Sequence, residues 1–190
     1  MPSLPEALTL DGDSLQLRDW READAPALEA VCGEWNVCQF TSVPWSYSLA
    51  EATAWVTRNR EKRSRGEVLS LAIVEAGGDE VVGNVNLGRF SDDGSRAALG
   101  YWLVPSARGR GLASAAARTL TNWGFQVMGL ERIELAILPE NAASHRVAER
   151  LGAKPEGLRP SSHEAGGRWW DMEIYVLHRP EETRLRGALK

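Results

Sequence analysis

The chain has 190 residues, of which 43% are hydrophobic and 25% are charged, and its formal net charge at pH 7 is −4. This is the composition of an ordinary globular protein, and it excludes a disordered or fibrous chain. Nucleic-acid binding normally requires a basic face, so we expect no nucleic-acid partner and a substrate that is neutral or cationic.

The sequence also lacks the usual marks of membrane and metal sites. No stretch approaches the roughly 18 continuous apolar residues of a membrane span, and the first residues lack the pattern of a signal peptide. Cys32 and Cys38 do not form a Cys-x-x-Cys pair that could begin a metal site. We therefore expect a cytoplasmic protein with no membrane contact and no metal.

The N-terminal part of the chain predicts a strand, a helix and an aromatic loop. Residues 14–19 alternate apolar and polar side chains, as an edge strand does, and residues 21–35 have helical spacing. The following segment, 36–48, has no clear period and carries Trp45 and Tyr47. These side chains are candidates for closing over a substrate, although aromatic residues that anchor a long connection to the core give the same pattern.

A second helix and an antiparallel meander come next. Ser48 is a suitable N-cap for a helix that ends in basic residues before Gly66. Residues 67–90 predict two strands joined by a turn at residues 77–79, and residues 95–104 predict a third strand.

The second half of the chain alternates helices and strands. A helical stripe in residues 110–128 consists of Leu112, Ala116, Leu120, Trp123 and Val127. The remaining predicted elements are a strand at 132–138, a helix at 141–152, and two closing strands at about 153–160 and 167–178. A strand, a helix and a strand in this order predict a parallel crossover. The fold class is therefore α/β with a mixed, mostly antiparallel twisted sheet and about four helices.

The junction between the third strand of the meander and the next helix carries two arginines and two glycines, Arg108, Gly109, Arg110 and Gly111. Backbone N–H groups at a helix start favour an anion, glycine lets these amides approach it, and arginine adds charge-assisted bonds. The junction predicts a pyrophosphate site; the alternative is a glycine-tolerant turn with solvated arginines.

Two other phosphate motifs do not fit this junction. A Walker loop requires Gly-Lys-Ser/Thr, but Leu112 and Ala113 follow Gly111 here, which excludes ATP or GTP by that route. A dinucleotide-binding fingerprint requires a third glycine, but this chain has Ser114 at that position. The fingerprint also requires an acidic residue at the end of the next strand, and none is present there. NAD is therefore disfavoured.

Residues 99–113, LGYWLVPSARGRGLA, resemble the acetyl-CoA motif of the GNAT superfamily of N-acetyltransferases. The motif, Arg/Gln-x-x-Gly-x-Gly/Ala, is matched by Arg108, Gly111 and Ala113. Residues 141–160 and 167–177 resemble the C-terminal half of RimJ/RimL-type members. The resemblance implies a single-domain GNAT-like fold with a splayed parallel strand pair over residues 14–178, with extensions at 1–13 and 179–190, and acetyl-CoA (coenzyme A) as cofactor.

The family also implies how the cofactor is held. Its pantetheine arm is expected between the strand ending near Val104 and the strand at 132–138, and its pyrophosphate on the amides of residues 109–113. Asn141 is the expected partner of a pantetheine amide, although it is also suited to be a helix N-cap. The expected cofactor contacts are Trp102, Leu103, Val104, Arg108, Gly109, Arg110, Gly111, Leu112, Ala113 and Asn141.

For catalysis, the resemblance points to a backbone N–H near Leu103 as oxyanion donor and to Ser144 as proton donor to the departing thiolate. Ser144 could instead be a polar residue of a first helical turn. RimJ/RimL relatives often carry a glutamate where this chain has Ala98. No obvious base remains, so we expect a water relay, with Asn84 and Asn86 as positioning candidates and His145 and His163 as weak ones.

The leading interpretation is an acetyl-CoA-dependent N-acetyltransferase that moves an acetyl group to a primary amine by direct attack in a ternary complex. The acceptor is a protein N-terminal amine or a small-molecule amine such as an antibiotic, contacted by Trp45, Tyr47 and Asn86. The alternative is a non-catalytic acyl-CoA-binding or regulatory module, suggested by the missing glutamate. A monomer or a homodimer is expected.

Overall fold

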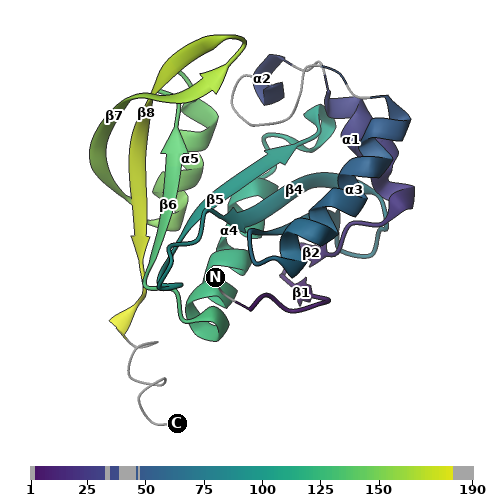
Figure 1. The fold of residues 1–190 in the computed structure, drawn as a ribbon, viewed down its shortest axis with the longest axis horizontal. Coiled ribbons are helices and arrows are strands. Elements are labelled where there is room, and N and C mark those ends of the chain that lie inside the picture. The colour runs from purple at the N-terminus through teal and green to yellow at the C-terminus, as the bar shows by residue number, and fades with distance from the viewer. Residues whose placement is uncertain (1–2, 33–34, 39–45, 47, 182–190) are drawn as a thin grey trace.

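The structure is a computed structural model that describes the chain except for residues 1–2, 33–34, 39–45, 47 and 182–190 (Figure 1). The described part forms one eight-stranded sheet in the order β1-β2-β3-β4-β5-β6-β8-β7. The strands are β1 Thr9–Asp11, β2 Leu15–Arg18, β3 Val68–Glu75, β4 Val81–Gly88, β5 Arg96–Leu103, β6 Arg132–Ile137, β7 Lys154–Ala165 and β8 Arg168–His178. All neighbouring pairs are antiparallel except β5 and β6, which confirms the predicted sheet.

Helices cover both faces of this sheet. They are α1 Ala25–Val31, α2 Trp35–Cys38, α3 Leu49–Ser64, α4 Leu112–Trp123 and α5 Ala142–Leu151, with short helical turns at η1 Glu22–Asp24, η2 Pro105–Ala107 and η3 Gly124–Met128. Leu71 and Ile73 of β3 pack in the core with α4, whereas Ala72 and Val74 pack with α1 and α3. Because successive strand side chains point to opposite faces, α1 and α3 lie on one face and α4 on the other.

The parallel pair separates soon after it begins. Only three residue pairs join β5 to β6, and the last of them is Ala98 with Glu134. Beyond that point β5 continues to Leu103 and β6 to Ile137 without pairing, so the two strands diverge from a common start (Figure 1). The splay that the family resemblance implied is present, and it leaves one edge of β5 open.

Local sequence signals explain where the main helices begin. Ser48 caps α3 through a capping box with Glu51, as its position predicted. Asn141 caps α5, its side chain accepting the Ser144 N–H at 3.1 Å. No helix in the described part of the chain is long and apolar enough to span a membrane.

The end of α4 differs from the prediction. The predicted stripe continues to Val127, but residues 124–128 form a π-helical turn, and Val127 is 67% exposed. A π turn holds more residues than an α turn and therefore rotates the following side chains off the stripe. The first closing strand, β7, also extends further than predicted, to a two-residue turn at Gly166 and Gly167, both with positive φ.

Candidate active site

The open edge of β5 carries the backbone groups of alternate residues. Val104 donates its N–H to the Val82 carbonyl at 2.9 Å, and the register places Trp102 opposite Asn84. In an antiparallel ladder, residues between such hydrogen-bonded pairs turn their N–H and C=O groups to the other side. The backbone of Tyr101 and Leu103 therefore faces the opening, while that of Trp102 and Val104 faces β4.

This alternation refines the predicted contacts along β5. The N–H of Leu103 lies at the open edge, as an oxyanion donor must. The Leu103 carbonyl lies at the same edge and accepts a hydrogen bond from the Arg108 Nε–H at 3.1 Å. Trp102 and Val104 were predicted to pair with the pantetheine arm through their backbone. Their backbone groups are turned to β4, so Tyr101 and Leu103 offer this pairing instead.

The Arg-Gly-Arg-Gly junction forms an open cradle at the start of α4. Gly109 and Gly111 have φ of 76° and 81°, which side chains rarely adopt, and a Cβ at either position would meet no atom within 4 Å. The first intrahelical bond runs from the Ala115 N–H to the Gly111 carbonyl. The N–H groups of residues 112–114 therefore have no partner within the helix, and they suit an anion.

A groove of about 510 Å³ leads from this cradle to the start of α5, and it includes Arg108, Gly109, Gly111, Ala113 and Asn141 in its lining. The Ser114 hydroxyl, in a residue only 7% exposed, lies in the same groove with no hydrogen-bond partner in the described part of the chain. A buried hydroxyl without a partner is unfavourable unless a ligand supplies one. The sequence showed Ser114 only as a mismatch to another motif, and its role was missed.

Three predicted cofactor residues, Val104, Arg110 and Leu112, contribute no side chain to this groove. The Arg110 guanidinium makes two hydrogen bonds with the Glu75 carboxylate, at 2.8 and 2.5 Å. Leu112 is buried in the core. Leu112 has a backbone N–H at the free start of α4, where it can meet a phosphate.

A second cavity, of about 350 Å³, lies on the face of the sheet that α3 covers. Four residues line both the groove and this cavity: Tyr101, Trp102, Asn141 and Ser144. The two spaces therefore meet where β5 has separated from β6. A ligand in the groove and a ligand in the cavity can approach each other only at this point.

Tyr101 and Ser144 form the polar part of this meeting point. Burial raises the pKa of the Tyr101 phenol to about 12, and its neighbour Ser144 opposes that shift by hydrogen bonding. The buried phenol oxygen makes no hydrogen bond of ordinary geometry within the described part of the chain. Tyr101 lies within the stretch that resembles the family motif, but a tyrosine in a strand carries no signal of which edge of that strand is open.

Asn84 and Asn86 have different surroundings. The Asn84 Oδ1 accepts hydrogen bonds from Trp20 Nε1 at 2.9 Å and from Ser70 Oγ at 2.7 Å, so this oxygen is already used within the protein. Asn86 lines the cavity, and its side chain lies over Gly100. Of the two, Asn86 is the one placed to contact a substrate.

The charged residues lining the cavity are basic: Arg58, Lys62, Arg89 and Arg159. No acidic side chain belongs to the described lining. Glu134, opposite Ala98 in the register, is held by Arg159 through bonds of 2.8 and 3.0 Å. The overall negative charge of the chain had favoured a cationic substrate, but the local charge of this cavity does not.

The two histidines lie in different places. His145 is engaged by Tyr175 Oη and the Pro139 carbonyl, both at 3.2 Å, which is a structural arrangement. His163 lines the cavity. Trp45 and Tyr47, the predicted acceptor contacts, lie outside the described residues. The described residues bring no three metal-ligating side chains together.

Comparison with known proteins agrees with this geometry. Residues 14–154 match the family model described as the acetyltransferase (GNAT) domain. An N-acetyltransferase of Bacillus licheniformis, p20, is 27% identical over 173 residues, which are 91% of this chain and 97% of that protein. The ribosomal-protein-serine acetyltransferase of Escherichia coli (strain K12) is 29% identical over 98 residues, 52% of this chain and 55% of that protein.

Solved structures share the fold. RimJ of Mycobacterium smegmatis, in complex with CoA-disulfide, has a TM-score of 0.81 at 24% identity. The match covers 96% of this chain and 94% of the RimJ chain. The ribosomal-protein acetyltransferase RimL, in complex with coenzyme A, has a TM-score of 0.80 at 23% identity. The match covers 90% of this chain and 98% of the RimL chain. The match of the family model over most of the sequence establishes the family: the chain belongs to the GNAT acetyltransferases.

Proposed function

We propose that the protein transfers the acetyl group of acetyl-CoA to a primary amine by direct attack in a ternary complex. One observation carries the proposal: the groove below the open edge of β5 and the cavity on the α3 face meet at Tyr101 and Ser144. Two reactants that enter from opposite faces of a sheet and meet at one point can react without a covalent enzyme intermediate.

Acetyl-CoA is the cofactor of the family, and the groove has the donors that it requires. Its pyrophosphate fits the glycine cradle and the N–H groups of residues 112–114. The Ser114 hydroxyl and the open edge of β5 suit the amides of the pantetheine arm. When bound, acetyl-CoA supplies the thioester carbonyl that the amine attacks.

The residues around the meeting point divide the chemistry between them. The Leu103 N–H, on the open edge, donates to the developing oxyanion, a contribution of about 2.7 to 4 kcal/mol in other enzymes. Ser144 donates its hydroxyl proton to the departing thiolate and regains one from the water that accepts the proton of the amine, so the hydroxyl is left neutral. The Tyr101 phenol stays protonated at neutral pH because burial raises its pKa to about 12, so it keeps an O–H group that can donate a hydrogen bond at the meeting point.

No carboxylate takes the proton of the amine, since Ala98 stands on the strand where relatives carry a glutamate. Asn86 lines the cavity and holds a water that accepts this proton. The rate then depends on how much of the acceptor is already in its neutral form.

The acceptor is a protein N-terminal amine or a small-molecule amine. The relatives named above include a ribosomal-protein-serine acetyltransferase, and an acetyltransferase whose structure contains acetyl-CoA and AMP has the same fold with a TM-score of 0.78 at 19% identity. The name of the first relative gives a ribosomal protein as acceptor, and the structure of the second contains a nucleotide beside acetyl-CoA. Trp45 and Tyr47 are proposed to close over the body of the acceptor.

The test is the release of free thiol from acetyl-CoA in the presence of added amines. An enzyme releases thiol continuously and yields an acetylated amine of matching amount. A non-catalytic acyl-CoA-binding module, the alternative suggested by Ala98, would bind acetyl-CoA and release no thiol with any amine. That second result would reject the proposed activity while leaving the cofactor groove in place.

A further inference from the structure

One face of α3 lines the acceptor cavity with both aromatic and basic side chains. Trp55, Arg58, Asn59 and Lys62 all belong to the lining, and their spacing of three and four residues places them on one side of the helix. Asn59 is anchored by its Nδ2, which donates to the Ser70 carbonyl at 3.4 Å. Arg58 and Lys62 are exposed and therefore keep their charged ends at the mouth of the cavity.

The strands opposite this helix contribute cations as well. Arg89, which follows β4, has an exposed side chain and a φ of 50°, an uncommon conformation outside glycine. Arg159 reaches the cavity from β7, but its charge is offset by Glu134. Ala98, which also lines the cavity, carries no charge. The described lining therefore holds three cations without an acidic neighbour in it.

We infer that the acceptor is a primary amine whose body carries an anionic group, a carboxylate or a phosphate, and that Arg58, Lys62 and Arg89 bind this group. The inference rests on the proposed function, because it assigns the substrate class of the same cavity. A cation-lined pocket in a protein of net charge −4 is not a consequence of overall composition. It therefore discriminates between acceptors by charge.

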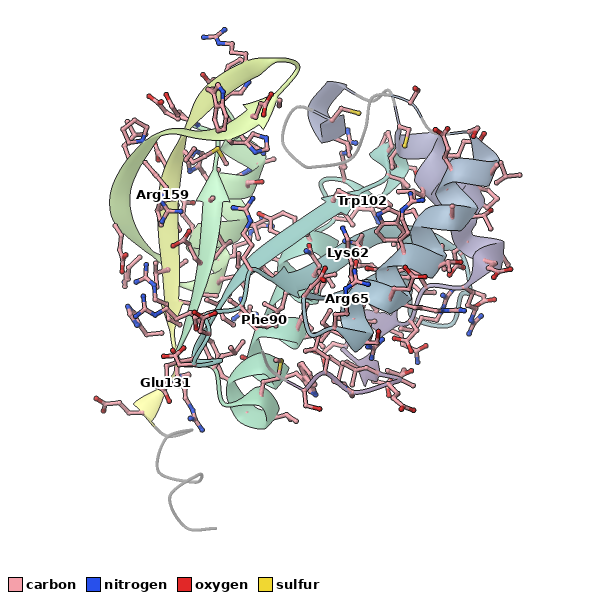
Figure 2. All side chains as sticks on the ribbon, in the orientation of Figure 1. Lys62, Arg65, Phe90, Trp102, Glu131 and Arg159 are labelled. Atoms are coloured by element: carbon pink, nitrogen blue, oxygen red, sulfur yellow. The ribbon has the colours of Figure 1, made fainter. Side chains whose placement is uncertain are left out.

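The position of the cations sets the distance between amine and anion. Trp20 contacts both Trp55 and Trp102, with ring centroids 5.2 and 6.0 Å apart, so the Trp55 end of α3 lies near the reactive end of β5. Lys62 is seven residues further along α3, about 10 Å at 1.5 Å per residue. Figure 2 shows Lys62 displaced from Trp102 toward the start of β5. Arg89 adjoins the Gly88–Ala98 pair, at the same end.

The rise of about 10 Å along α3 from Trp55 to Lys62 therefore sets the length scale of an acceptor with its amine at the reactive end of β5 and its anion near Lys62. An extended peptide rises about 3.3 Å per residue, so an acidic side chain at the third residue of a peptide N-terminus meets this requirement. A small amine with a terminal phosphate on a six-carbon chain meets it as well. The shared chemistry is the anion, and these two sources are distinguished by experiment.

The experiment measures binding directly, with the protein saturated by coenzyme A so that no reaction occurs. Isothermal titration calorimetry compares the peptides Ser-Ala-Glu-amide and Ser-Ala-Gln-amide, and 6-aminohexyl phosphate and 6-aminohexanol. We expect at least one anionic probe to bind about 10-fold tighter than its neutral match, with the difference shrinking at about 0.5 M salt. Tighter binding by the peptide or by the phosphate identifies the source.

The double variant Lys62→Gln, Arg58→Gln should bind the anionic probe no more than about threefold tighter than its neutral match. Lys154→Gln is the matched control, since Lys154 is an exposed lysine of β7 outside both lining sets. Equal binding of charged and neutral probes, no binding by any of them, or a preference that survives the double variant would overturn the inference.

Thiol release is measured on the same four probes with acetyl-CoA in place of coenzyme A. Release from neutral and anionic amines alike, without a binding preference, rejects the anionic acceptor and leaves the acetyltransferase activity intact. A binding preference without thiol release rejects the activity and retains the cation-lined site. The two failures are therefore distinguishable.

Discussion

Gly100 lies directly beneath Asn86, so close that a Cβ at Gly100 would fall 2.5 Å from the Asn86 Oδ1. The two residues are paired across β4 and β5, and both line the acceptor cavity. The missing side chain at Gly100 is what allows the Asn86 amide to rest on the strand. This pair therefore fixes one polar group in the wall of the cavity.

Gly100→Ala should displace the Asn86 side chain and raise the acceptor KM several-fold, with little effect on the KM of acetyl-CoA. The fold should survive, because the atom that must move is the end of a side chain and not backbone. Asn86→Ala should have a similar kinetic effect. If Gly100→Ala acts by displacing Asn86, the acceptor KM of the double variant should be no higher than that of either single variant. Additive increases in KM would show that Gly100 acts in another way.

Gly111→Glu should abolish stabilisation by acetyl-CoA, because it places a carboxylate among the phosphates. For the unchanged protein, ligand at about 100 times its Kd should add about 2.7 kcal/mol of apparent stability, measured as a thermal shift. Gly94→Glu is the control, since Gly94 also has positive φ and open space around its Cβ. Both variants bear the strain of positive φ, but only the first should lose the ligand shift. An equal shift in both would refute the cradle.

Ser144→Ala should lower turnover by roughly 10² and leave acetyl-CoA affinity within a few-fold, because a proton donor to the thiolate matters only in the transition state. The α5 cap should remain, since Asn141 accepts from the Ser144 backbone N–H and not from its hydroxyl. Steady-state kinetics and direct binding of acetyl-CoA measure the two quantities separately. Lost affinity with unchanged turnover would make Ser144 a cofactor contact only.

Burial of Tyr101 predicts a specific change in stability at high pH. Its pKa is raised from 10.0 to about 12, so the folded state holds the phenolic proton more tightly than the unfolded state does. The resulting stabilisation is present below pH 10 and is lost as pH rises toward 12, by roughly 2 to 3 kcal/mol. Tyr101→Phe should remove this component. Denaturant unfolding of both proteins from pH 8 to about 11 measures it, and parallel curves would contradict it.

Much of the fold could be predicted because its signals are local. The meander, the caps at Ser48 and Asn141 and the glycine cradle each depend on a few adjacent residues. The π turn at 124–128 could not be predicted, because Gly124 lies close against Leu87 of β4, which is a tertiary contact. Such contacts leave no periodic pattern in the sequence.

The site was predictable to the same extent and for the same reason. Arg110 was assigned to the phosphate from its place in the motif, and its pairing with Glu75 joins residues 35 positions apart. The hydrogen bonds that occupy Asn84 come from Trp20 and Ser70, on other elements. The helical spacing of Arg58 and Lys62 was present in the sequence, but only the fold shows that this face of α3 borders the cavity.

The cations of the cavity also predict how the rate depends on pH. A positive charge near a bound amine disfavours its protonated form, so for an amine that carries no anion to offset these cations, the pKa of the bound amine should lie below that of the free amine. A unit charge at about 10 Å and an effective dielectric constant of about 20 shifts the pKa by roughly one unit. With no strand carboxylate at Ala98, the neutral amine is the reactive species.

The pH profile of kcat/KM should therefore follow the pKa of the free amine, whereas the profile of kcat should turn at a lower pH, since it reports the bound complex. Lys62→Gln should move the kcat profile back toward the free amine and leave the kcat/KM profile in place. Lys154→Gln should move neither. Initial rates with two amines of different pKa, each measured from pH 6 to about 10, test this. A kcat profile that coincides with the free amine in the unchanged protein would show that the cations do not act on the reacting nitrogen.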